Sequence, residues 1–142
     1  MSTTGLEVFD TTLQKTSVWL NDIMAELDST DRHLAYLALR ATLHALRDRL
    51  PAGEAVHLGA QLPMLIRGFY YEGWTPSGKP EKEHRAQFLS GILGCFGSAT
   101  PPDAERVARA VFKVLARHVT AGEIKGVKQL LPKDIRSLWP EA

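Results

Sequence analysis

The sequence predicts an all-α, internally duplicated helical domain of two three-to-four-helix halves related by a pseudo-twofold axis. Three observations predict this fold. A stretch of 52 residues repeats once, without a gap, at an offset of 69. Apolar residues recur at three- and four-residue steps, and no segment alternates apolar and polar residues as a strand does. A single domain over 1–142 is expected, with repeat 1 at about 5–72, a connecting loop at 73–81 and repeat 2 at about 82–140.

The duplication rests on aligning residues 19–70 with residues 88–139. Apolar exchanges such as Trp19 with Phe88 and Tyr70 with Trp139 keep the burial pattern as well as the letters. The alignment gives 14 identical pairs: Leu20/Leu89, Ile23/Ile92, Ser29/Ser98, Ala35/Ala104, Arg40/Arg109, Ala41/Ala110, Leu46/Leu115, Ala52/Ala121, Gly53/Gly122, Glu54/Glu123, Leu62/Leu131, Pro63/Pro132, Ile66/Ile135 and Arg67/Arg136.

The first helix is expected over about residues 8–27, where apolar residues fall on one stripe. Thr4 followed by Glu7 has the pattern of a capping box, in which a hydroxyl and a carboxylate bind free backbone N–H groups. The stripe consists of Phe9, Leu13, Thr16, Leu20, Ile23, Met24 and Leu27.

A second helix should begin after Thr30 or Asp31 and run to about Leu50. In the second copy, residues 100–103 (Thr-Pro-Pro-Asp) predict the same start. The threonine caps the helix, proline stands where its missing N–H is not needed, and aspartate meets the positive helix end.

A third helix is expected to begin at residues 52–54 and again at residues 121–123, with a capping box from Thr120 to Glu123 in the second copy. Pro63 and Pro132 should break or kink these helices, because proline removes a backbone donor. A short final helix should follow each proline. Its inward-facing residues are expected to be Ile66, Phe69 and Tyr70 in one copy and Ile135, Leu138 and Trp139 in the other.

Composition is that of a soluble globular domain: 142 residues, 44% hydrophobic and 23% charged. The net charge is +1, divided as −2 over residues 1–71 and +3 over residues 72–142. This imbalance is too weak to predict dedicated nucleic-acid binding. We find no targeting signal and no membrane-spanning run. The single cysteine, Cys95, excludes an internal disulfide and a thiolate zinc cluster, and it favours a cytoplasmic protein.

Several segments resemble one protein family. They are residues 9–16, 38–41, 43–50, 58–63, 67–68, 70–74, 122–124, 130–132 and 138–140. Over essentially the whole chain the sequence resembles the bacterial domain-of-unknown-function family numbered 2267. The resemblance implies a helical domain of bacterial origin and carries no established reaction, ligand or catalytic residues.

Signals for an enzyme are few, and the sequence indicates no catalytic residue, no metal site and no cofactor. It contains no phosphate-binding glycine loop of the usual form, no His-Glu-x-x-His motif and no serine elbow. The five histidines are scattered. Cys95 lies in an apolar run without a charged neighbour, so we expect a packed thiol rather than a nucleophile.

The candidate binding residues lie in the connection between the two copies. Three aromatic rings precede or enter a segment with two glycines and two prolines. One interpretation makes Tyr70, Tyr71, Trp74 and Lys79 a surface for a protein partner or a second copy. The other interpretation has the aromatic rings pack inward and fasten the two halves together.

Two functions remain open from the sequence: a small interaction module that uses this aromatic loop, and a pocket protein that holds a small apolar ligand between the two halves. The expected lining of such a pocket is Trp19, Leu46, Phe88 and Phe112. We favour the interaction module.

Overall fold

The computed structural model describes residues 2–76, 84–97 and 102–141, and within these ranges all regular structure is helical. The fold class is therefore all-α, as the apolar periodicity predicts. The helices are α1 (Glu7–Glu26), α2 (Arg32–Arg47), α3 (Ala52–Ala60), α4 (Met64–Tyr71), α5 (Arg85–Gly94), α6 (Ala104–His118), α7 (Ala121–Gln129) and α8 (Lys133–Arg136).

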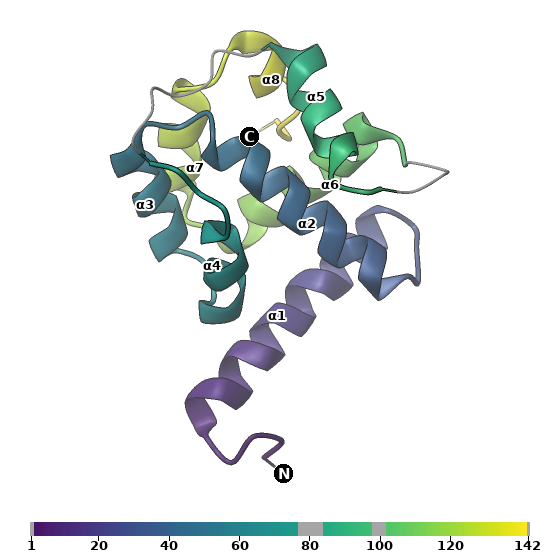
Figure 1. Cartoon of the computed structure of the whole chain (residues 1–142), viewed down its shortest axis with the longest axis vertical. Coiled ribbons are helices and arrows are strands. Elements are labelled where there is room, and N and C mark those ends of the chain that lie inside the picture. The colour runs from purple at the N-terminus through teal and green to yellow at the C-terminus, as the bar shows by residue number, and fades with distance from the viewer. Residues whose placement is uncertain (1, 77–83, 98–101, 142) are drawn as a thin grey trace.

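Helix α2 lies at the centre of the molecule and packs against α1, α4, α5 and α6 (Figure 1). On one side α3 packs on α4 and α7, and on the other side α5 packs on α6 and α8. A single core joins these helices, so residues from both halves of the sequence are buried together.

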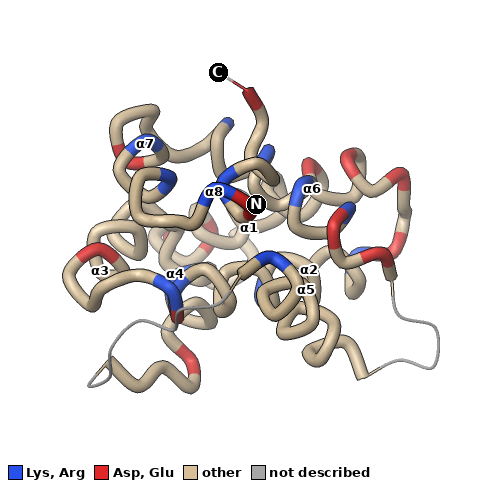
Figure 2. Tube along the Cα trace, turned by 90° about the horizontal axis from the view of Figure 1, so that it is seen from above, with Lys and Arg blue, Asp and Glu red and all other residues tan. Residues whose placement is uncertain are grey.

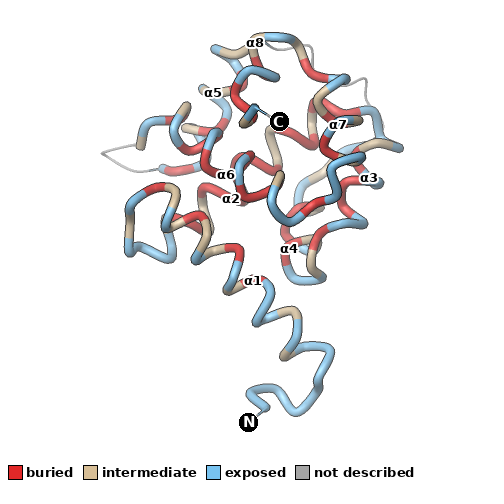
Figure 3. Tube along the Cα trace, turned by 180° about the vertical axis from the view of Figure 1, so that it is seen from behind, coloured by how far each residue is buried: buried red, intermediate tan, exposed pale blue. Residues whose placement is uncertain are grey.

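Helix α1 is only partly covered. Its C-terminal half packs on α2 and α6, whereas its N-terminal half projects from the body of the molecule and is largely exposed (Figures 1 and 3). Thr16, Trp19 and Ile23 are buried, but no residue of α1 before Thr16 is. The apolar stripe predicted for this helix therefore has two environments.

Side chains cap the starts of three helices. Asp31 caps α2 as expected, whereas the N-cap of α6 is Asp103 rather than Thr100, and at α7 only the hydroxyl half of the expected capping box forms, because the Thr120 amide donates to Gln61 Oε1. The Asp31 carboxylate accepts from the Leu34 amide at the start of α2, and the Asp103 carboxylate accepts from the Glu105 and Arg106 amides at the start of α6. The Thr120 hydroxyl caps α7 by accepting from the Glu123 amide. Thr100 and Pro101, which were expected to begin α6, lie outside the described residues.

The capping box expected at α1 is wrong. The N-cap of α1 is Leu6, with no side-chain cap, and the Thr4 hydroxyl instead donates to Asp10 Oδ1 at 2.8 Å. Asp10 also accepts from the Thr4 amide and from the Ser2 hydroxyl. Asp10 binds these groups because its two carboxylate oxygens can accept several hydrogen bonds at once. The turn that contains Ser2 and Thr4 folds back over the first helical residues and brings the donors to it.

Both prolines separate helices as predicted. Helix α3 ends at Ala60 and α4 begins at Met64 with Pro63 as its N-cap, while α7 ends at Gln129 and α8 begins at Lys133 after Pro132. The residues expected to face inward from α4 and from the segment after Pro132 are all buried.

The C-terminal end of α4 is held by the last turn of α2. His44 Nε2 lies 2.7 Å from the Phe69 carbonyl oxygen, and the buried Arg47 donates from Nη1 to the Tyr70 and Glu72 carbonyls at 2.7 and 2.8 Å. Carbonyls at a helix end have no partner within the helix. These contacts satisfy three of them and fix α4 against α2.

Four charged residues and a histidine connect α1 to α6. Glu26 lies 3.2 Å from both Lys113 Nζ and Arg117 Nη2, and Asp22 lies 3.4 Å from Arg117 Nη1 and 2.7 Å from His118 Nε2. This cluster fixes the C-terminal half of α1, leaving its N-terminal half to depend on other contacts.

Candidate functional site

Exposed apolar side chains concentrate in one region of the described surface. Seven of the nine large ones come from residues 6–18 or from the first two residues of α4. These seven are Leu6, Val8, Phe9, Leu13, Val18, Met64 and Leu65; the other two are Val56 and Leu130. Single exposed apolar residues are scattered over the surface of most soluble proteins, whereas a concentration of them is typical of a binding surface.

Part of this region is hollow. A groove of about 970 Å³ runs between α1, α2 and α4, and we call it the apolar groove. Its apolar lining is Phe9, Leu13, Leu20, Tyr36, Met64, Leu65 and Phe69, together with the surface of Gly68. Its polar lining is Thr4, Thr12, Thr16, Arg32, His33 and Glu72.

The two walls of the apolar groove are joined by one hydrogen bond. The Leu65 amide of α4 donates to the Thr12 hydroxyl of α1 at 2.9 Å. Thr12 thereby takes the place of the side-chain cap that Pro63 lacks.

One end of the groove carries Arg32. Its guanidinium donates to the Asn21 side chain at 2.9 Å and to the Ser17 hydroxyl at 3.3 Å. Both partners are neutral, so within the described residues the positive charge of Arg32 has no acidic partner.

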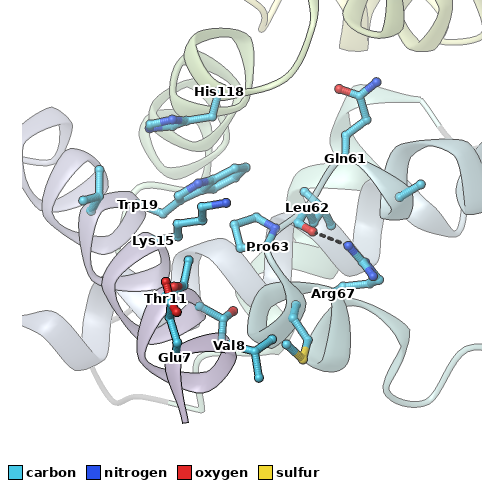
Figure 4. A pocket seen from close by; sticks show the side chains of 14 residues that line it. Glu7, Val8, Thr11, Lys15, Trp19, Gln61, Leu62, Pro63, Arg67 and His118 are labelled. Carbon is cyan, nitrogen blue, oxygen red and sulfur yellow. Dashed lines mark hydrogen bonds between the residues drawn. The ribbon is translucent and has the colours of Figure 1, made fainter. Parts of the chain in front are cut away.

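A second hollow of about 970 Å³ lies on the other side of α1, against the α3–α4 turn and His118, and we call it the polar cleft (Figure 4). Glu7, Lys15, Gln61 and Arg67 reach it from opposite sides. Arg67 is already occupied, since it donates to the Gly59 and Leu62 carbonyls at 3.0 and 2.9 Å. Because Glu7 and Lys15 carry opposite charges, the cleft is not strongly selective for either sign.

His118 is the histidine at the rim of the polar cleft. Its ring stacks on Trp19 with centroids 4.9 Å apart (Figure 4). Its Nε2 is 2.7 Å from Asp22 Oδ2. Both contacts join α6 to α1. These two contacts explain His118 as a structural residue that links the two helices.

The aromatic side chains of the loop are more buried than the side chains of a binding surface would be. Tyr70 is fully buried and its hydroxyl donates to the Ala55 carbonyl at 2.6 Å, so this ring offers no surface to a partner. Burial also raises the pKa of the Tyr70 hydroxyl well above its usual value. Tyr71 and Trp74 are half-buried against the core, with ring centroids 5.4 Å apart. Lys79 lies outside the described residues.

The residues expected to line a pocket between the halves instead fill the core. Leu46, Phe88 and Phe112 are each 0% exposed, so no space large enough for a water molecule adjoins them. Phe112 stacks on Trp139 with centroids 4.1 Å apart. Trp19 is also buried, although it is one of the residues that line the polar cleft. The sequence suggested these residues for a pocket because they are large and apolar at matched positions of the two copies. Core residues have the same properties.

Three further features bear on chemistry. Among the residues that the structure describes, no group of three or more His, Cys, Asp or Glu could hold a metal ion. Cys95 is exposed, contrary to the expectation of a packed thiol, because it follows the last turn of α5 and faces away from the core. No helix in the described ranges is both long and apolar enough to cross a membrane.

The fold and the groove together define a small all-helical protein with a concentrated apolar surface. The chain belongs to the conserved family DUF2267, described as uncharacterized, whose family model matches residues 16–138. Membership confirms the resemblance noted from the sequence. No curated protein matches the chain.

Proposed function

We propose that this protein is an interaction module that binds a protein partner, or a second copy of itself, through the apolar groove and the exposed N-terminal half of α1. The observation that carries the proposal is that four of the nine large apolar residues exposed on the described surface line this one groove, namely Phe9, Leu13, Met64 and Leu65. Apolar side chains exposed on an α-helix lose water when a partner covers them, and this is the main driving force of association.

The position of the groove differs from the aromatic loop that the sequence indicates. The groove is preferred because Phe9 and Leu13 are 45% and 41% exposed, whereas Tyr70 is buried and Tyr71 and Trp74 already pack against the core. In the groove, α1 and α4 also present two walls that can hold a helical segment, which is a common mode of peptide recognition.

Charge supports a protein partner rather than a nucleic acid. Basic and acidic residues are interspersed over the described chain (Figure 2). Several basic side chains are used internally, since Lys113 and Arg117 pair with Glu26, and Arg85 and Arg109 pair with Glu105. Dedicated nucleic-acid binding needs a continuous basic face. A cytoplasmic location in a bacterium is part of the proposal and is consistent with a single free cysteine.

The proposal includes an internal duplication in which two three-to-four-helix halves are related by a pseudo-twofold axis. Its support is local geometry repeated at the offset of 69. Helices α3 and α7 have bounds that differ by 69 at both ends, and the N-caps of α4 and α8 have φ and ψ of −55° and 149°, and −57° and 153°. Arg67 and Arg136 each donate to the carbonyl five residues earlier, at Leu62 and Leu131.

The proposed surface can be tested by affinity capture from the host with cross-linking. The bait is the tagged chain, compared with Leu13→Arg in the groove and with Val56→Arg as the matched control. Val56 is suitable because it is exposed to a similar extent but lies on α3, outside the groove. We expect the parent chain and Val56→Arg to capture the same protein, and Leu13→Arg to lose it. Capture by all three baits alike would overturn the groove as the binding surface.

A further inference from the structure

The apolar stripe of α1 continues beyond the point where the protein covers it. Phe9, Leu13, Thr16 and Leu20 follow one another at steps of four, three and four residues and lie on one face of the helix. Thr16 is buried and Leu20 half-buried, whereas Phe9 and Leu13 are exposed along the groove. The surface that would complete the stripe is therefore absent from the described chain.

The spacing of this stripe is the same when it is read backwards. In an antiparallel pair of identical helices, residues at one level have numbers with a constant sum. Pairing Phe9 with Leu20 gives 9 + 20 = 29, and pairing Leu13 with Thr16 gives 13 + 16 = 29. One register therefore brings the two exposed residues of one copy, Phe9 and Leu13, beside Leu20 and Thr16 of the other copy, at the end of the stripe that lines the inner part of the groove. Antiparallel helices with apolar seams of this period pack closely.

Charge favours the same register. Asp10 flanks the stripe, and its carboxylate binds only the hydroxyls and amide of Ser2 and Thr4, so among the described residues it has no basic partner. In the register with a sum of 29, Asp10 falls level with position 19 of the other copy. The Arg32 guanidinium is bound between Ser17 and Asn21, which is also about the level of position 19. Each copy thus offers an acid where the other offers a base.

We propose that the apolar groove binds the N-terminal half of α1 from a second copy of this chain, in an antiparallel twofold dimer with reciprocal Asp10–Arg32 ion pairs. A twofold interface uses the same surface on both copies, and the groove meets this condition because α1 forms one wall and also supplies the occupant. The inference rests on the proposed function, which it deepens by naming the partner.

The first experiment is sedimentation equilibrium of the purified full chain from 1 to 200 µM. We expect a concentration-dependent species of twice the 15.7 kDa of one chain. Leu13→Arg should raise the dissociation constant on the order of 100-fold, as removal of a central apolar contact does, while Val56→Arg should leave it unchanged. Circular dichroism of each variant checks that the fold is kept, which is expected because both residues are exposed.

The second experiment exchanges the charges. Asp10→Arg and Arg32→Asp should each be monomeric alone, because each homodimer would place like charges together at both ends. Mixed in equal amounts, the two variants should form a heterodimer, because one copy then carries two bases and the other two acids. Native mass spectrometry separates the mixed species from the homodimers by mass.

The outcomes separate the inference from the function on which it rests. A chain that stays monomeric at 200 µM, or charge variants that do not combine when mixed, would overturn the second copy as the occupant. If the monomeric chain still captures another protein in a manner that depends on Leu13, the proposed function stands and only the partner assigned here is wrong.

Discussion

Trp74 illustrates, at the scale of one residue, that the burial of a side chain and not its residue type decides whether it stabilises the fold or is available to a partner. Its indole ring is half-buried against the core and lies beside the Tyr71 ring at 5.4 Å between centroids. The ring therefore stabilises the end of α4 while keeping one side in solvent.

For Trp74→Ala we expect a loss of about 1 to 3 kcal/mol in the free energy of unfolding, measured by denaturant titration. The loss should be smaller than the 3 to 5 kcal/mol typical of a fully buried aromatic ring, because part of this ring is already exposed. Binding through the groove should be unchanged, since Trp74 does not line it. A loss well under 1 kcal/mol would mean that the ring does not fasten the loop.

His44 links a single side chain to the pH dependence of stability. Burial lowers the pKa of His44 below its ordinary 6.5, an effect that Arg47 and Arg40 reinforce and that the contact with the Phe69 carbonyl opposes. The unfolded chain therefore binds a proton at His44 more readily than the folded chain does. Its contribution to stability is complete above pH 6.5 and declines as the pH falls below that value.

We expect the melting temperature of the parent chain to fall between pH 7.5 and 5 more steeply than that of His44→Gln. Glutamine can still donate from a nitrogen to the Phe69 carbonyl but takes up no proton in this range. Thermal melts of the two proteins at half-unit steps of pH measure the difference. Parallel curves would show that His44 does not titrate differently in the folded and unfolded states.

At the scale of helices, the two proline turns are the elements that the sequence describes best. Leu62 and Leu131 immediately precede Pro63 and Pro132, and both are buried. The carbonyl of each leucine also accepts a hydrogen bond from the arginine five residues later. Apolar packing and the backbone contact therefore act at the same position.

Leu62→Ala and Leu131→Ala should each reduce the free energy of unfolding by about 2 to 5 kcal/mol, because each leaves a cavity in the shared core. Denaturant titrations monitored by circular dichroism provide the measurement. Leu130→Ala is the matched control, since its side chain is 43% exposed and its loss should be under about 1 kcal/mol. Equal losses for Leu130 and Leu131 would show that the side chains of the α7–α8 turn have been assigned wrongly to core and surface.

Helix boundaries could be predicted where a local chemical rule applies. Aspartates at 31 and 103 and prolines at 63 and 132 act within a few residues of themselves, so the sequence contains the whole interaction. The capping box at Thr4 failed because the N-cap is Leu6, two residues later, and because Asp10 instead of Glu7 accepts from the Thr4 amide. Cys95 was misplaced because an apolar run does not reveal on which side of a helix end the chain turns away.

The candidate site could not be predicted in the same way. The periodicity of α1 identifies the apolar stripe but does not reveal that the body of the molecule ends near Thr16. Phe9 and Ile23 satisfy the same pattern and differ only in what lies across from them, which tertiary packing decides. For the same reason Phe88 and Phe112 were assigned to a pocket when they form the core.

At the scale of the whole molecule, the two halves of α1 differ: the C-terminal half is held against the rest of the protein, whereas the N-terminal half is largely exposed. The held half is bound by the acidic side chains of Asp22 and Glu26 to α6. Local stability in a protein follows the number of buried contacts, so the two halves should open at different rates.

Amide hydrogen exchange should therefore be faster over residues 8–14 than over residues 18–26 when the chain is dilute. Raising the protein concentration through the range of self-association should slow exchange over residues 8–14 and over the start of α4, because a second copy would cover both walls of the groove. Mass spectrometry of peptic fragments resolves these segments. Leu13→Arg should show no such dependence on concentration.

The hydrogen bond from the Leu65 amide to the Thr12 hydroxyl has a consequence for the energetics of recognition. It spans 53 residues of sequence and sets the separation of α1 and α4 before any partner arrives. A groove of preset width spares its occupant the entropic cost of ordering the receptor, so preorganisation raises affinity without adding a contact. In the proposed complex, the Thr12 hydroxyl would therefore contribute to affinity by holding α1 and α4 at a fixed separation.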